Sequence, residues 1–99
     1  MSDATVIDVT LVEATVRSVA SGDETAIARI VAEHHASMVR VAWVIADDPD
    51  VALDAVQSAW AIAWRELHRL SEPARIAPWL VAIAANETRA AMREQGGAW

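Results

Sequence analysis

The stretch D-D-P-D-V-A-L-D-A-V-Q-S-A-W-A-I-A-W-R, residues 47–65, decides how the chain folds. Pro49 has no backbone N–H and disfavours helical angles at Asp48, so a preceding helix must end at this point. Asp48 can cap a new helix, and Pro49 can occupy its first turn. We therefore expect two helices that are joined by a very short connection here.

The helix that starts near residue 49 has two different faces. Its apolar residues recur every three or four positions, which predicts a buried stripe on one side. The expected members are Leu53 (or Ala52), Val56, Trp60, Ala63, Trp64 and Leu67. The other face carries Asp50, Asp54, Gln57, Ala61 and Arg65, and it is acidic in its N-terminal half.

Upstream, a second amphipathic stripe predicts a helix of about five turns before Asp47. Ser21 and Glu24 fit an S-x-x-E capping box at its start. The stripe consists of Ile27, Ile30, Val31, His34, Met38, Val41 and Ile45. Residues 11–20 also repeat with a helical period and predict an N-terminal helix, whereas residues 1–10 have no such period, and we expect the first few residues to form a loose tail.

Downstream, residues 68–78 contain two prolines and no sustained period, which predicts a connecting loop. A last helix follows, with Gly96 and Gly97 at its end. Its expected apolar side consists of Trp79, Leu80, Ile83, Ala84 and Met92. Trp43 is also expected in the core. The fold class is therefore all-α, a compact bundle of three main helices plus an N-terminal helix.

Composition excludes several classes of function. The chain has no Cys and only three Gly, so thiolate metal sites and a Gly-rich phosphate loop are excluded. The neighbours His34 and His35 point about 100° apart on a helix and cannot both face one ion. We predict no enzyme activity, metal or cofactor, and the lack of a signal peptide or membrane span favours a cytoplasmic protein.

The charge distribution is uneven. The net charge of −6 disfavours tight binding to duplex DNA. Residues 67–99 nevertheless hold four of the eight arginines and three of the fourteen acidic residues, and the chain has no Lys. If a polyanion binds, the last third is therefore the expected place.

Three motifs in register resemble the second conserved region of extracytoplasmic-function sigma factors, a branch of the bacterial sigma-70 family. They are S-G-D-E-T-A-I-A-R-I-V-A-E-H-H at 21–35, residues 47–65 as quoted above, and P-A-R-I-A-P-W-L-V-A-I-A-A-N-E-T-R at 73–89. The most specific parts are D-x-x-Q with the following aromatics, and P-W-L-x-x-I-A-x-N from Pro78 to Asn86. The resemblance implies a region-two domain over 21–95, after an N-terminal tail and helix (1–20) and before a linker or tail (96–99).

The resemblance implies a module for transcription initiation. It docks on the clamp helices of the largest RNA polymerase subunit and binds the melted, single-stranded minus-ten element of the promoter, with the loop 68–78 reading bases. The resemblance also gives an anti-sigma factor as a further candidate partner and implies no binding to a membrane. By motif position, the polymerase-binding residues are Asp50, Asp54, Gln57, Ser58 and Ala61, and the DNA-binding residues are Arg69, Arg75, Trp79, Asn86, Arg89 and Arg93.

This sequence also departs from the family pattern. The family usually has an acid at the positions of Leu53 and Ser58 and a basic residue at Ile62. It also has charged residues where this chain has Ala82, Ala85, Ala90 and Glu94, so we expect DNA binding weaker than is usual in the family. Two alternatives stay open: a degenerate sigma-like module that binds proteins without melting promoters, and a plain oligomeric helical bundle.

Overall fold

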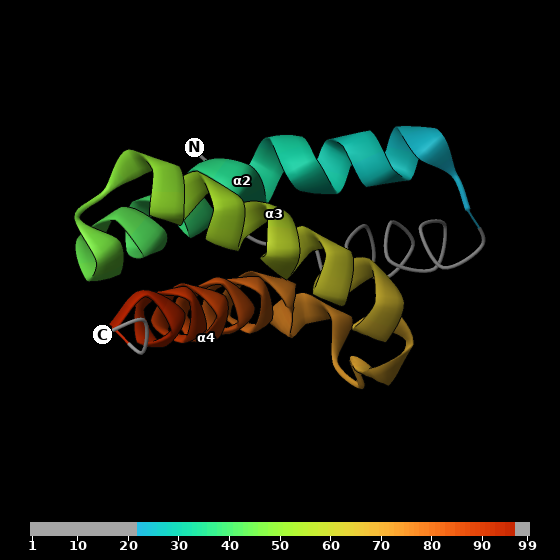
Figure 1. The fold of residues 1–99 in the computed structure, drawn as a ribbon. Helices are drawn as coiled ribbons and strands as arrows, with labels where there is room; N and C mark the ends of the chain where they lie inside the picture. Colours follow the sequence, from blue (N-terminus) through green and yellow to red (C-terminus); the bar gives the residue numbers. More distant parts are fainter. Residues whose placement is uncertain (1–21, 97–99) are drawn as a thin grey trace, which may run out of the picture.

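The described part of the structure, residues 22–96 of a computed structural model, is an antiparallel arrangement of three long helices (Figure 1). They are α2 (Glu24–Ala46), α3 (Pro49–Glu66) and α4 (Ile76–Gly96), and the short 3-10 helices η2 (Leu67–Arg69) and η3 (Pro73–Arg75) connect α3 to α4. α2 and α4 run in one direction and α3 in the other, and each long helix packs against both others. The predicted all-α bundle of three main helices is confirmed, while the predicted tail and helix within 1–20 lie outside the described residues.

The connection between α2 and α3 forms as its local chemistry predicts. Asp47 adopts the left-handed conformation (φ 53°), and its backbone N–H donates to the carbonyl of Trp43 at 2.8 Å. The side chain of Asp48 accepts hydrogen bonds from the backbone N–H groups of Asp50 and Val51 at 2.9 and 3.3 Å. Asp48 is therefore the N-cap of α3, with Pro49 in its first turn, as predicted.

The start of α2 differs from the prediction. The N-cap is Asp23, whose carboxylate accepts hydrogen bonds from the backbone N–H groups of Thr25 and Ala26 at 2.9 and 3.2 Å. The capping box from Ser21 is therefore wrong. Asp23 lies next to the first helical residue, where its short carboxylate reaches the first unpaired N–H groups.

The core lies between the three helices and joins the predicted stripes in one cluster. Buried alanines let the helices approach closely, and larger side chains fill the space between them. The cluster includes Ile30, Met38, Val56, Trp60, Leu67 and Leu80, with Ile27, Val31, Trp64, Trp79 and Ile83 partly buried against it. Of the two residues that could begin the α3 stripe, Ala52 is fully buried, whereas Leu53 is 49% exposed. The stripe therefore begins with Ala52.

Two large apolar residues predicted in the core lie at the surface. Trp43 is 42% exposed because it follows Ala42, which faces the core, and successive helix residues point about 100° apart. Met92 is 39% exposed because the stripe Leu80, Ala84, Thr88 turns by about 40° with each four-residue step and reaches the surface. Thr88, one turn before Met92, is still buried, and its hydroxyl donates to the carbonyl of Ala84 at 2.7 Å.

The predicted loop 68–78 is shorter in the structure. η2 covers its start, η3 lies within it at Pro73–Arg75, and α4 already begins at Ile76. Pro78 therefore lies in the first turn of α4. A proline is compatible with that place, since the first N–H groups of a helix have no partner within the helix.

Candidate functional site

The outward face of α3 presents the predicted polymerase-binding residues to solvent. Asp50, Asp54, Gln57, Ser58 and Ala61 are all exposed, whereas the opposite side of the helix is buried. Within residues 22–96, neither Asp50 nor Asp54 takes part in an ion pair. The first half of α3 therefore offers carboxylates that a basic partner can reach.

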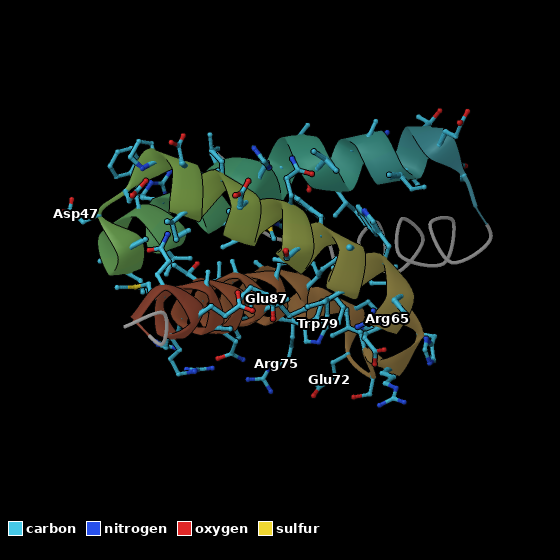
Figure 2. All side chains as sticks on the ribbon, in the orientation of Figure 1. Asp47, Arg65, Glu72, Arg75, Trp79 and Glu87 are labelled. Atoms are coloured by element: carbon cyan, nitrogen blue, oxygen red, sulfur yellow. The ribbon has the colours of Figure 1, made fainter. Side chains whose placement is uncertain are left out.

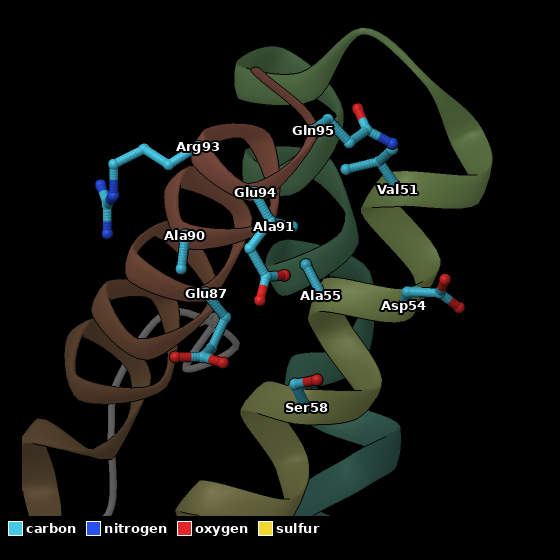
Figure 3. Close-up of a pocket in the computed structure, with 10 residues that line it drawn as sticks. All are labelled: Val51, Asp54, Ala55, Ser58, Glu87, Ala90, Ala91, Arg93, Glu94 and Gln95. Atoms are coloured by element: carbon cyan, nitrogen blue, oxygen red, sulfur yellow. The ribbon is translucent and has the colours of Figure 1, made fainter. Parts of the chain in front are cut away.

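A groove of about 740 Å³ runs beside this face, between α3 and the second half of α4 (Figure 3). Small residues such as Ala55, Ala90 and Ala91 line it and leave the space between the helices open. Figure 3 shows the carboxylates of Glu87 and Glu94 in the groove. Asp54 and Ser58 lie on its other side, so the acidic surface extends from α3 onto α4. Sequence reasoning missed the two glutamates because only the packing of α4 against α3 brings them there.

The exposed side of α4 carries the predicted DNA-binding residues Asn86, Arg89 and Arg93. They are three and four positions apart, all three are exposed, and they share one face of the helix. A guanidinium nitrogen of Arg89 lies 3.4 Å from the amide oxygen of Asn86. In Figure 3 the side chain of Arg93, which borders the groove, points away from α3.

The remaining predicted DNA-binding residues lie on the connection between α3 and α4 (Arg69 and Arg75) and in the first turn of α4 (Trp79). A pocket of about 380 Å³ opens there, and Arg75 and Trp79 line it together with Leu70, Ser71, Glu72 and Pro78. Trp79 is half-buried and packs against the core, so its ring is held in place. Figure 2 shows Glu72 and Arg75 projecting on the side of the molecule away from α2.

Both arginines of this connection have carboxylate neighbours. Arg69 Nε lies 3.1 Å from Glu66 Oε1, and Arg75 Nη1 lies 3.7 Å from Glu72 Oε1. The sequence places Glu66 and Glu72 three residues before these arginines. On a helical turn this spacing brings two side chains together.

Aromatic side chains link α2 to α3 beneath these surfaces. Trp60 Nε1 donates a hydrogen bond to Nδ1 of His35 at 3.0 Å, which requires that nitrogen to be unprotonated. The rings of Trp60 and Trp64 stack with centroids 5.0 Å apart. Burial lowers the pKa of the neighbouring His34, although the carboxylate of Glu33 at 3.9 Å acts in the opposite direction.

Neither a metal site nor a membrane span is found in the part of the chain that the structure describes. Among residues 22–96, no three His, Asp or Glu side chains are close enough together to hold a metal ion. Over the same residues, no helix combines the length and the apolar character that crossing a membrane requires.

The described part of the chain is thus an all-helical domain that presents an acidic face on one helix and an arginine-bearing face on another. Residues 30–97 match the family Sigma-70 region 2, which is more than half of the chain, and the chain therefore belongs to this family. No curated protein and no solved structure matched the chain. Region 2 of sigma factors acts in RNA polymerase binding and promoter recognition during transcription initiation, and the family is not a class of enzymes.

Proposed function

We propose that this domain docks through the outward face of α3 on the clamp helices of the largest RNA polymerase subunit. There it would hold the melted, single-stranded minus-ten element with the α3–α4 connection and α4. The observation that supports this most is the separation of the two kinds of exposed charge within one family-assigned domain. Within residues 22–96, Asp50 and Asp54 in the first half of α3 take part in no ion pair, while the predicted DNA-binding arginines stand on the connection and on α4.

The acidic face suits a protein partner with basic side chains. Charge complementarity across such an interface raises the association rate and orients the encounter. Asp50 and Asp54 stand one helical turn apart, with Gln57 and Ala61 continuing the same face. Gln57 can donate and accept hydrogen bonds, whereas Ala61 leaves room for a helix to approach.

The second surface suits a single strand better than a duplex. A melted base can leave the stack and enter a pocket, and the indole of Trp79 lines the α3–α4 pocket of about 380 Å³ together with polar side chains. Arg89 and Arg93 on α4 would contact phosphates and hold the strand without reading it. Because few arginines are available, we propose that polymerase supplies the remaining affinity by holding the domain at the promoter.

A two-part binding experiment tests this function. The first part measures binding of the 99-residue chain to an isolated clamp-helix fragment of a bacterial RNA polymerase. The second part adds a pool of randomised single strands to the complex and sequences those that are retained. We expect a preferred sequence in the pool. Asn86→Ala should relax that preference, while Arg93→Ala should weaken the retention of all sequences alike.

Arg40→Ala serves as the control for Arg93→Ala, since it removes the same charge from an exposed position on α2. It should leave both parts of the experiment unchanged. Retention of the pool without any sequence preference would contradict base reading by this domain. Failure to bind the clamp helices would contradict polymerase docking through α3.

A second candidate function is a sigma-like module that docks on polymerase without holding the strand. The contacts of Arg69 with Glu66 and of Arg75 with Glu72 favour it, because they reduce the positive charge that the connection offers to DNA. The same experiment separates the two functions. Clamp-helix binding without retention of any single strand would select this one.

A further inference from the structure

Glu66, the last residue of α3, contacts two arginines at once. Its Oε1 lies 3.1 Å from Nε of Arg69, and its Oε2 lies 3.4 Å from Nε of Arg65. Both carboxylate oxygens therefore have a cationic neighbour. The glutamate side chain is 30% exposed, whereas the side chains of Arg65 and Arg69 are 68% and 73% exposed.

The position of Glu66 gives these contacts a physical reason. The C-terminal end of a helix carries a partial negative charge, so a carboxylate there is disfavoured unless cations stand beside it. Arg65 and Arg69 supply these cations, one before and one after Glu66 in the chain. Since Glu66 is the more buried partner, it is held in place while the arginines remain accessible from solvent.

Glu72 forms a looser copy of the same arrangement. Its Oε1 lies 3.7 Å from Nη1 of Arg75, and both side chains are largely exposed, at 68% and 70%. Exposed pairs of this kind contribute little, and they exchange readily with water and salt. The contacts of Glu66 with its arginines should therefore be stronger than the contact of Glu72 with Arg75.

We propose that Glu66 competes with DNA phosphate for the arginines of the α3–α4 connection and thereby sets how tightly this domain holds a single strand. The inference rests on the proposed function, since it concerns the same DNA surface. An arginine guanidinium donates to a carboxylate and to a phosphate with the same N–H groups. A phosphate that takes the Nε–H of Arg69, or that of Arg65 beside the connection at the end of α3, therefore has to replace a contact with Glu66. Glu72 acts in the same way, but more weakly, on Nη1 of Arg75.

The test measures binding of a fluorescein-labelled oligothymidine single strand by fluorescence anisotropy at neutral pH. Glu66→Gln keeps the shape of the side chain and removes its charge. We expect it to raise the affinity about 3- to 5-fold, while Glu72→Gln should raise it by about 2-fold at most. The plot of log affinity against log salt should become steeper by about 0.7 for each phosphate newly contacted.

The matched control is Glu33→Gln. It changes the net charge by the same amount, but Glu33 lies on α2 and contacts His34 instead of an arginine. Circular dichroism and urea unfolding establish that each variant folds. In the double variant Glu66→Gln/Arg69→Gln, the gain should be smaller, because one of the two arginines that Glu66 contacts is gone and only Arg65 remains.

Two outcomes overturn the inference in distinguishable ways. If the natural sequence binds the strand and Glu66→Gln gains no more than Glu33→Gln, the competition is refuted and the proposed DNA contact stands. If neither the natural sequence nor Glu66→Gln binds the strand, alone or on the clamp-helix fragment, the competition and the proposed strand contact are both refuted.

Discussion

The acidic face of α3 and the arginine-bearing surface of the connection and α4 are both exposed, but their charges are used differently. On α3, Asp50 and Asp54 take part in no ion pair within the described residues. On the connection, Arg69 and Arg75 contact glutamates of their own chain. A partner of α3 thus meets available charge, whereas a phosphate at Nε of Arg69 or at Nη1 of Arg75 has to displace a contact that already exists. We therefore expect the proposed protein docking to be stronger than the proposed strand binding, and the strand binding to depend on it.

Both surfaces are built on the same core, so the largest loss of stability should come from a change of Trp60, which links α2 to α3. Trp60 is 6% exposed, stacks on Trp64 and donates a hydrogen bond to His35. Trp60→Ala should lower the free energy of unfolding by about 3–5 kcal/mol in urea denaturation, a large share of the stability of a small domain. Both activities should then be lost together.

Trp60→Phe is a milder substitution at the same position. It keeps most of the ring and removes the N–H donor to His35, so it should lower the free energy of unfolding much less than Trp60→Ala. Loss of only one of the two activities in Trp60→Ala would contradict the idea of a common scaffold.

Asp54→Arg separates the two surfaces. Reversal of an exposed interface charge should lower the affinity for the clamp-helix fragment by about 1–3 kcal/mol, with little change in the thermal midpoint. The affinity for oligothymidine should not fall, because Asp54 lies on the acidic side. Glu33→Arg on α2 makes the same change of charge and should leave docking unaffected. Unfolding of the Asp54→Arg variant would instead assign Asp54 a structural role.

The sequence predicted the elements whose structure depends on local chemistry. Asp48 and Pro49 define the start of α3 by hydrogen bonds and by a fixed φ, and both effects act within one turn. The spacing in α3 then placed Asp50 and Asp54 on the solvent side, since one buried stripe determines the orientation of the whole helix. These parts needed no knowledge of the rest of the molecule.

The parts that could not be predicted depend on contacts between helices or on how a stripe drifts along a helix. Glu87 and Glu94 lie in the groove beside Asp54 only because α4 packs against α3 there. Trp43 and Met92 were predicted in the core by hydrophobicity, but their angular positions put them at the surface. The functional roles of the site residues stay predictions, because exposure shows that a residue is accessible and does not identify the partner that binds it.

The cap of α3 offers a smaller change that acts on one surface. Asp48→Ala removes the acceptor for the N–H groups of Asp50 and Val51 and should lower the free energy of unfolding by about 1 kcal/mol. Docking on the clamp helices should weaken as the first turn of α3 frays, while oligothymidine binding stays constant. Asp48→Asn keeps a good capping side chain and should remain close to the natural sequence in urea denaturation. Equal losses in the two variants would indicate an effect of charge and not of capping.

The smallest effect concerns His34 on α2, which belongs to neither surface. Burial lowers its pKa in the folded domain below the value of 6.5 that it has in the unfolded chain. Between these two pKa values the unfolded state binds more protons, so stability is greatest above pH 6.5 and declines as the pH falls toward the folded value. Urea denaturation between about pH 7.5 and about pH 5.5 measures this decline.

His34→Gln should remove this component of the decline and leave the contributions of the other titrating groups in place. The difference in free energy of unfolding between the natural sequence and His34→Gln should therefore be constant above pH 6.5 and shift against the natural sequence below it. Glu33→Gln should make the decline steeper, because the carboxylate of Glu33 favours the protonated imidazole. Parallel curves for the natural sequence and His34→Gln would contradict the lowered pKa. Since His34 lies outside both surfaces, binding per folded molecule should not follow this titration, and a pH dependence of docking that persists in His34→Gln would have to arise at the surfaces themselves.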